Sequence, residues 1–166
     1  MRFHHHISIR STPVFALACL AAGCDPARST GSVEQPDSIV LERTQCSGDC
    51  PAYRLSLSFS GAIHFRSLDP GDNGRTAMDV LPHGAFEELA RQAEDAEINV
   101  LPESIIGTVY CTARSTNQAS AIVTIFRGAR TKRVDDYQGC YPGPTALRRL
   151  ELAIDNAAAS GRWINP

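Results

Sequence analysis

The sequence lacks the signatures of several protein classes. It contains no Gly-x-Ser-x-Gly, no phosphate-binding glycine loop, no Cys-x-x-Cys and no His-Glu-x-x-His. It also lacks a net basic charge, because 18 aspartates and glutamates outnumber 16 lysines and arginines, and the formal net charge is −2. A nucleic-acid-binding module normally presents a basic face. We therefore expect no nucleic-acid partner, no cofactor and no enzymatic activity.

A long apolar run is missing as well. A membrane-spanning helix takes roughly 20 consecutive apolar residues, and the longest such stretch, residues 14–22, is too short. The remaining composition is that of an ordinary globular protein, with 43% hydrophobic and 20% charged residues in a chain of 166. This length predicts a single domain.

The first 24 residues are typical of a bacterial export signal. Arg2 and Arg10 give a positive start, and residues 14–22 form the apolar core of the signal. The sequence Leu-Ala-Ala-Gly-Cys at residues 20–24 then resembles a lipobox, with leucine one position further from the cysteine than in the commonest pattern. We predict a signal peptide over residues 1–23 and lipidation of Cys24. The protein would be exported and membrane-anchored, facing the periplasm.

Two alternatives to the lipoprotein signal stay open. One is an ordinary secretory signal cut near Ala22 or Gly23, and the other is an uncleaved anchor. Asp25 resembles an inner-membrane retention signal, so the choice between inner and outer membrane is left open. Removal of residues 1–23 takes two arginines and no acidic residue, so the mature net charge is −2 − 2 = −4. We expect residues 24–37 to form the lipidated cysteine and a flexible tether, because residues 25–37 are polar and contain proline, glycine and serine.

Alternation of apolar and polar residues predicts the first strands of a folded domain over residues 38–166. Residues 39–41 are a short β-prone run, and residues 53–60 alternate as in a strand with one buried face. Ser60-Gly61 predicts a tight turn into a return strand at residues 63–66. Residues 69–74 (DPGDNG) predict a loop.

The second half of the domain predicts two helices and two more strands. Apolar residues recur on one helical face of residues 82–98 and again of residues 144–161. Residues 119–127 are apolar on both faces and predict a central strand, whereas polar residues 130–134 predict an edge strand. We expect Trp163 to pack back on the core, and residues 101–118 are irregular.

The predicted order is β-β-β-α-β-β-α. Hairpin connections imply antiparallel pairing, and two amphipathic helices need one face of a sheet to cover. The predicted fold is therefore an α+β two-layer sandwich, in which two helices cover a mainly antiparallel sheet of about five strands.

Four cysteines remain in the mature domain, and an even number in an oxidising compartment favours disulfides in one of three connectivities. We prefer Cys46–Cys50, where Gly48 permits a sharp turn, and Cys111–Cys140, which would pin the irregular segment. By the chain-entropy relation, loops of about 5 and about 30 residues contribute about 2 and about 3.6 kcal/mol. Loss of the second bridge should therefore destabilise the domain more.

The alternative is metal or redox chemistry at Cys46 and Cys50. Their C-x-x-x-C-P spacing resembles the copper-binding motif of Sco-type thioredoxin-fold proteins, in which a helix N-terminus lowers the thiol pKa. Here Pro51 leads into an alternating strand, which favours a structural bridge. His64 on a polar strand face, His83 at a helix start, and the cation candidate Asp135-Asp136-Tyr137 are weaker sites.

Residues 41–53 read LERTQCSGDCPAY. This stretch resembles the signature of the DUF6438 family of small bacterial domains, in which a strand ends near Arg-Thr and C-x-G-x-C-P-x-Tyr, an alternating strand and a glycine turn follow. The matching residues are Arg43, Thr44, Cys46, Gly48, Cys50, Pro51, Tyr53 and Gly61. The resemblance covers roughly residues 39–164, and it implies the domain boundaries and an envelope location but no activity.

We expect a monomeric, non-catalytic lipoprotein whose domain binds a partner, either another envelope protein or a cell-wall component. The membrane would be reached through the N-terminal lipid. A further hypothesis is an inhibitor or sensor with an exposed loop at residues 101–118. An ordered, projecting loop with an apolar patch would favour it.

Overall fold

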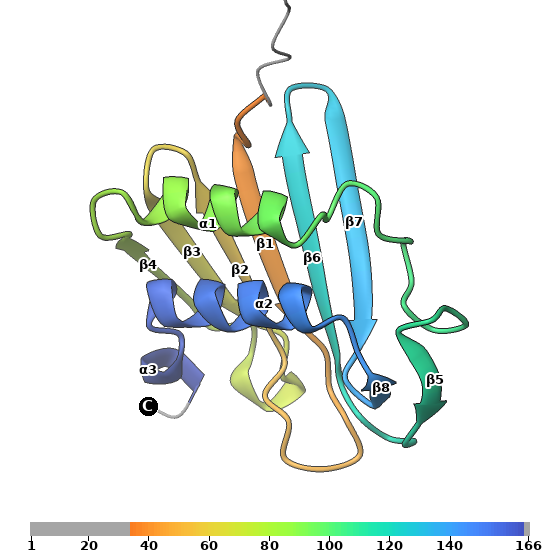
Figure 1. The fold of residues 1–166 in the computed structure, drawn as a ribbon. Helices are drawn as coiled ribbons and strands as arrows, with labels where there is room; N and C mark the ends of the chain where they lie inside the picture. The colour runs from red at the N-terminus through yellow and green to blue at the C-terminus, as the bar shows by residue number, and fades with distance from the viewer. Residues whose placement is uncertain (1–33, 165–166) are drawn as a thin grey trace, which may run out of the picture. The chain divides into compact units, whose positions relative to one another are not determined.

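A computed structural model describes residues 34–164, and the predicted signal peptide and Cys24 lie outside them. Within this range a six-stranded sheet has the order β4-β3-β2-β1-β6-β7, and every neighbouring pair is antiparallel (Figure 1). Its strands are β1 (Ser38–Arg43), β2 (Tyr53–Ser58), β3 (Ala62–Ser67), β4 (Thr76–Val80), β6 (Ser120–Arg127) and β7 (Arg130–Tyr137).

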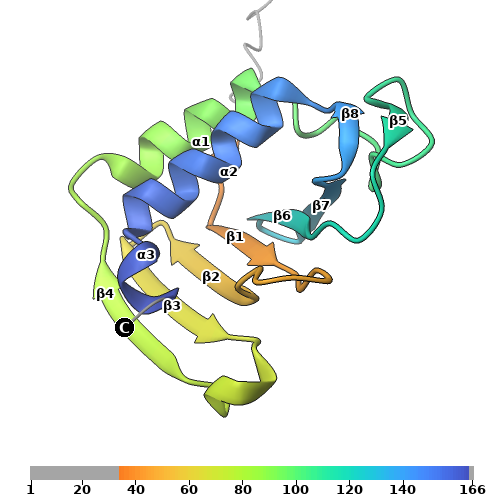
Figure 2. The same cartoon turned by 90° about the horizontal axis from the view of Figure 1, so that it is seen from below.

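Two longer helices cover one face of this sheet. They are α1 (Ala85–Asp95) and α2 (Thr145–Ala158), and the short α3 (Gly161–Ile164) follows α2. Figure 2 shows α1 and α2 side by side over the sheet. A separate two-stranded sheet pairs β5 (Cys111–Arg114) with β8 (Cys140–Pro142). No helix among the described residues is long and apolar enough to cross a membrane.

The α+β, mainly antiparallel fold is confirmed, but the described part of the main sheet has six strands where about five were predicted. The additional strand is β4. Its exposed residues include Met78 and Val80, so hydrophobicity does not alternate with burial along it. The predicted loop before it holds the 3₁₀ turn η1 (Pro70–Asp72). Residues 101–118 were predicted to be irregular, and they contain β5.

The predicted positions of the other elements agree with the structure within a few residues. Helix α1 begins at Ala85, not at Pro82, because His83 and the left-handed Gly84 form a turn that is closed by a 3.0 Å hydrogen bond from the Ala85 N–H to the Pro82 carbonyl. Strand β6 lies inside the sheet, and β7 lies at its edge.

Strand alternation builds the core. Odd-numbered side chains of β1 to β3 face the helices, and α1 and α2 face them with a stripe of apolar residues. The central buried side chains are Ile39, Leu41, Leu55, Leu57, Phe86, Leu89, Val123, Ile125, Leu147, Leu150 and Ile154. Trp163 of α3 packs against Phe65 with ring centroids 5.3 Å apart, so the predicted contact of Trp163 with the core is present.

Residues 34–37, the end of the predicted tether, lie against the domain. The Arg127 Nε donates to the Glu34 carbonyl at 2.9 Å, and the Asp37 N–H donates to the Phe126 carbonyl at 2.8 Å. These bonds hold the start of the domain on the β6–β7 hairpin.

Candidate functional site

The first candidate site is the turn between β1 and β2. Cys46 and Cys50 form a disulfide there, with their Cα atoms 5.5 Å apart. The Cys50 N–H donates to the Gly48 carbonyl at 2.9 Å, so Gly48 lies at the tip of the turn. This pairing is the one preferred from the sequence.

A hollow of about 620 Å³ adjoins this disulfide, between the turn, Asp69 and Ile164. Both cysteines are half-buried at its wall. The next regular element is strand β2, which begins at Tyr53. Cys50 is therefore followed by a strand and not by a helix, whose N-terminus lowers the thiol pKa in thioredoxin-like proteins. Among the described residues, no group of three or more histidine, cysteine, aspartate or glutamate side chains could hold a metal ion.

The second candidate is a projection that we call the disulfide lobe, residues 105–114 and 139–143. Cys111 and Cys140 join its two strands, with their Cα atoms 4.7 Å apart. The Gly143 N–H also donates to the Tyr110 carbonyl at 2.9 Å. Figure 2 shows β5 and β8 beside the end of the sheet that carries β7. The predicted irregular segment is thus an ordered structure held by a disulfide.

Large apolar side chains are exposed on the disulfide lobe. Val109 is 77% exposed and Tyr141 is 73% exposed, and Ile106 is also exposed. Covering such side chains removes apolar area from water and is favourable at about 25 cal/mol per Å². The lobe therefore offers apolar contact area on a backbone that is already ordered.

A third group of residues forms a polar cluster between α2 and the sheet. Asp155 of α2 accepts hydrogen bonds from the Tyr53 hydroxyl at 2.6 Å, the Arg43 Nη2 at 2.8 Å and the Ser160 hydroxyl at 2.9 Å. Burial, followed by the bond to Asp155, raises the pKa of Tyr53 to about 12. Arg43 and Tyr53 lie in the family signature, and the structure brings both to one carboxylate.

The same cluster continues to Asp136, Arg148 and Glu151. Asp136 is 0% exposed and its Oδ2 lies 2.8 Å from the Arg148 Nε. The Gln138 amide donates to Asp136 at 3.0 Å and to the Glu151 Oε2 at 3.2 Å. Asp136 is therefore held by Arg148 and Gln138, and the cation site considered for residues 135–137 is not formed around it.

Glu151 is the most perturbed titratable group of the cluster. It is 1% exposed, and burial, followed by the nearby charge of Asp136, raises its pKa to about 8, although Arg43 and Arg148 act in the opposite direction. Its Oε1 has no hydrogen-bond partner among the described residues. With Glu151 protonated, the half-buried Arg43 and Arg148 balance Asp136 and Asp155, so the cluster is neutral. Polar groups cost the least free energy to bury when no charge among them is left unpaired.

Sequence reasoning did not find Glu151 or Asp155. The signal that could have found them is spacing, because Arg148, Glu151 and Asp155 recur at intervals of three and four and form one stripe of α2. Their partners come from β1, β2 and β7, and no local pattern connects these strands to α2. The two histidines considered as sites lie apart, His64 on the face of the sheet without helices and His83 before α1.

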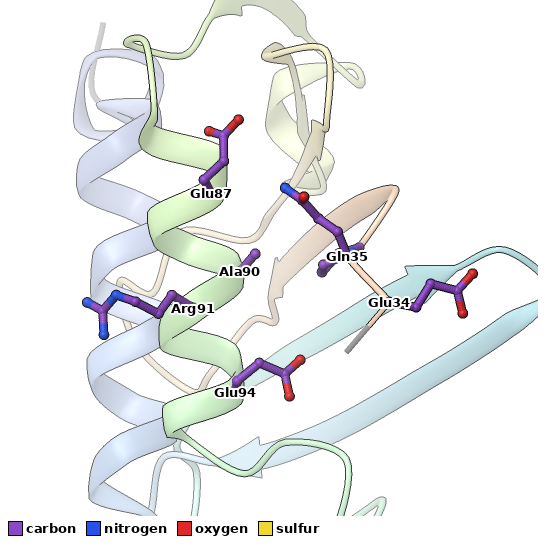
Figure 3. Close-up of a pocket in the computed structure, with 7 residues that line it drawn as sticks. Glu34, Gln35, Glu87, Ala90, Arg91 and Glu94 are labelled. Atoms are coloured by element: carbon purple, nitrogen blue, oxygen red, sulfur yellow. The ribbon is translucent and has the colours of Figure 1, made fainter. Parts of the chain in front are cut away.

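A smaller groove of about 250 Å³ lies between residues 34–36 and α1 (Figure 3). The carboxylates of Glu87 and Glu94 lie on the groove side of α1, whereas the Arg91 guanidinium points away from residues 34–36. Glu94 forms an ion pair with the buried Arg127. This groove therefore marks the place where the N-terminal segment meets the domain.

The fold and these sites define a small disulfide-bonded α+β domain with a buried polar cluster. Residues 37–158 match a family described as "Domain of unknown function (DUF6438)". The chain therefore belongs to the DUF6438 family, as its signature indicated. No curated protein matches the sequence.

Proposed function

We propose that the protein is an exported lipoprotein, tethered to a membrane by lipid on Cys24, whose domain binds a partner protein without catalysis. The export signal and lipobox support the first part of this proposal. The second part rests on the disulfide lobe, with exposed Val109 and Tyr141 on a backbone pinned by the Cys111–Cys140 bridge.

Rigidity is what favours binding at the disulfide lobe. An interface formed by a mobile loop loses conformational entropy on association, and a preorganised loop loses less. The lobe is held by a disulfide, by the pairing of β5 with β8, and by a 2.9 Å hydrogen bond between Gly143 and Tyr110. Aromatic side chains are also enriched among the residues that dominate binding energies, which supports Tyr141 as an anchor.

The polar cluster supports a non-catalytic domain. A general acid or base must come within hydrogen-bond reach of the reacting group. Glu151 and Asp136 are 1% and 0% exposed, and Asp136 is held by Arg148. Both carboxylates are thus out of reach of a substrate in solution in this arrangement of α2 and the sheet.

Site-specific photo-crosslinking in cells tests the binding surface. A photoreactive amino acid is placed at Val109 or Tyr141 and, as a control, at Leu152, an exposed apolar residue of α2 outside the lobe. We expect one adduct of discrete mass from the two lobe positions and none from position 152. A charge introduced as Val109→Asp should suppress the adduct formed from position 141. Equal adducts from all three positions, or none from the lobe, would refute this surface.

The lipid tether is tested by Cys24→Ser. The wild-type protein should fractionate with membranes and carry the mass of acyl chains, and the variant should lose both. A single myristoyl chain binds membranes only marginally, and two or more chains anchor stably. If the variant stays membrane-bound with the signal removed, the lipoprotein proposal is wrong.

A second candidate function is metal or redox chemistry at Cys46 and Cys50, favoured by their position at the wall of the 620 Å³ hollow. Thiol labelling of protein isolated without reductant separates the two proposals. Labelling of both cysteines, or a bound metal ion, would support chemistry at this turn. A quantitative bridge that resists mild reductant would exclude it.

A further inference from the structure

The two edges of the main sheet differ in how far other residues cover them. At the β7 edge, the Asp135 N–H donates to the Glu103 carbonyl at 2.8 Å and the Ile105 N–H donates to the Asp135 carbonyl at 3.0 Å. Residues 103–105 thus cover part of that edge. At the opposite end, β4 has β3 as its neighbour, and no other described strand pairs with it. Proteins usually protect such edges with charges, proline or a covering segment.

Hydrogen bonding shows which groups of β4 face outward. The Ser67 N–H donates to the Arg75 carbonyl, and the Leu81 N–H donates to the Gly61 carbonyl, both at 2.8 Å. In an antiparallel pair the bonded positions alternate, so odd-numbered residues bond to β3 and even-numbered residues point away. Thr76 and Met78 therefore present their N–H and carbonyl groups outward. No described residue bonds to them.

Of the outward N–H groups of β4, only that of Val80 donates a hydrogen bond within the described residues. The Asp79 Oδ1 accepts a 2.8 Å hydrogen bond from the Val80 N–H. This leaves two outward donors, at Thr76 and Met78, and outward carbonyls along the strand. Met78 is 75% exposed, and its side chain lies on the face of the sheet that the helices do not cover. The strand offers backbone groups and apolar area together.

The face of the sheet beside β4 is basic. A hollow of about 400 Å³ there is lined by residues of β2, β3 and β4, including Arg54, His64, Arg66 and Met78. Arg54 pairs with Glu42 at 3.0 Å. Arg66 is exposed and has no ion-pair partner among the described residues. The positive side chain of Arg66 on β3 is thus separated by β4 alone from any segment that pairs with the outer edge of β4.

We propose that β4 binds an extended segment of a partner protein as an added strand, with an acidic side chain directed to Arg66. Neighbouring strands lie about 4.8 Å apart, so a segment next to β4 lies about 10 Å from β3. An arginine and a carboxylate side chain can span that distance together. Backbone bonds provide affinity in this mode of recognition, and alternate side chains provide specificity.

Charge favours this occupant over a second copy of the chain. Two β4 strands pairing about Met78 would place two basic faces side by side, and Arg66 of each copy would gain no opposite charge. An acidic segment instead provides the missing partner. The proposal is independent of the disulfide lobe, because β4 and β7 lie at opposite ends of the sheet.

A library of random nonapeptides displayed on phage is the probe, selected against the full chain as isolated from cells. We expect enrichment of β-prone peptides that carry aspartate or glutamate. On binding, the backbone amides of Thr76 and Met78 should become at least ~10-fold slower in hydrogen exchange, because they acquire partners. Arg66→Glu should weaken the selected peptides at least ~10-fold, as expected for a lost charge pair at an interface.

Met78→Pro removes one outward N–H, and proline is tolerated at such edge positions. It should weaken binding at least ~10-fold, whereas Met78→Thr, which keeps the N–H, should bind more tightly than the proline variant. Unchanged exchange at Ala77, whose N–H faces β3, shows that the proline variant is folded. The proposal is overturned if no peptides are enriched, or if the selected peptides bind Met78→Pro as tightly as the wild type. It is also overturned if the protected amides lie outside β4, or if raising the protein concentration alone protects the β4 amides.

Discussion

Replacement of Glu151 by glutamine should change how stability depends on pH. The folded domain raises the pKa of Glu151 to about 8 from an ordinary value of 4.5, mainly through burial. The folded state therefore binds this proton more tightly than the unfolded state does. The contribution of Glu151 to stability is fully present below pH 4.5 and is lost as the pH rises through 8.

The size of the effect follows from proton linkage. One proton contributes about 1.4 kcal/mol per pH unit between the unfolded and folded pKa values, so the whole interval corresponds to a few kcal/mol. Glutamine has the shape of a protonated glutamate. Its oxygen can accept from the Arg43 Nη1 and the Gln138 amide, as the Glu151 Oε2 does. Its NH₂ would replace the Oε1, which has no partner among the described residues.

The assay is urea unfolding of both proteins, with disulfides intact, at several values between about pH 5 and pH 7.5. The free energy of unfolding of Glu151→Gln minus that of the wild type should rise by about 1.4 kcal/mol per pH unit. Glu87→Gln, at an exposed position of α1, is the matched control and should give a flat difference. A flat difference for Glu151→Gln as well would show that Glu151 is ionised in the folded domain, and the neutral cluster would be refuted.

Two further predictions concern stability. Tyr53→Phe removes a 2.6 Å hydrogen bond to Asp155 and should lower the free energy of unfolding by about 2 kcal/mol; an unchanged urea midpoint would contradict this role. Replacing Cys111 and Cys140 by serine opens the loop with a sequence separation of 29, against 4 for Cys46 and Cys50. The free energy of unfolding should fall by about 3.6 kcal/mol when Cys111 and Cys140 are replaced and by about 2 kcal/mol when Cys46 and Cys50 are replaced. A larger fall for the Cys46 and Cys50 variant in thermal unfolding would contradict the loop-length reasoning.

The fold could be predicted from the sequence where burial alternates with position. Strand β2 shows period-two alternation, and α1 has an apolar stripe, so both were found. Strand β4 was missed because its exposed apolar residues Met78 and Val80 break the relation between hydrophobicity and burial. If β4 receives another strand, as proposed, those side chains are exposed because they belong to an interface.

The candidate sites divide in the same way. The Cys46–Cys50 turn could be predicted because its cysteines, glycine and proline are close in sequence. The polar cluster could not, since the Arg43–Asp155 pair joins residues separated by 112 positions. A contact of that kind depends on how α2 lies over the sheet. Hydrophobic periodicity predicts that a helix covers a sheet, but it does not set the register between them.

The polar cluster also positions the disulfide lobe. The Arg148 guanidinium bonds to Asp136 and, through its Nη2, donates to the Cys140 carbonyl at 3.0 Å. Gly143, which follows β8, has a left-handed φ of 77°, and a Cβ added there would lie 2.2 Å from the same guanidinium, so a side chain at residue 143 would be strained and would displace Arg148. One side chain therefore connects the buried carboxylate to the base of the lobe. If the domain binds through the lobe, as proposed, that base must be fixed, and the half-buried Arg148 then contributes to binding by holding the residue next to Tyr141.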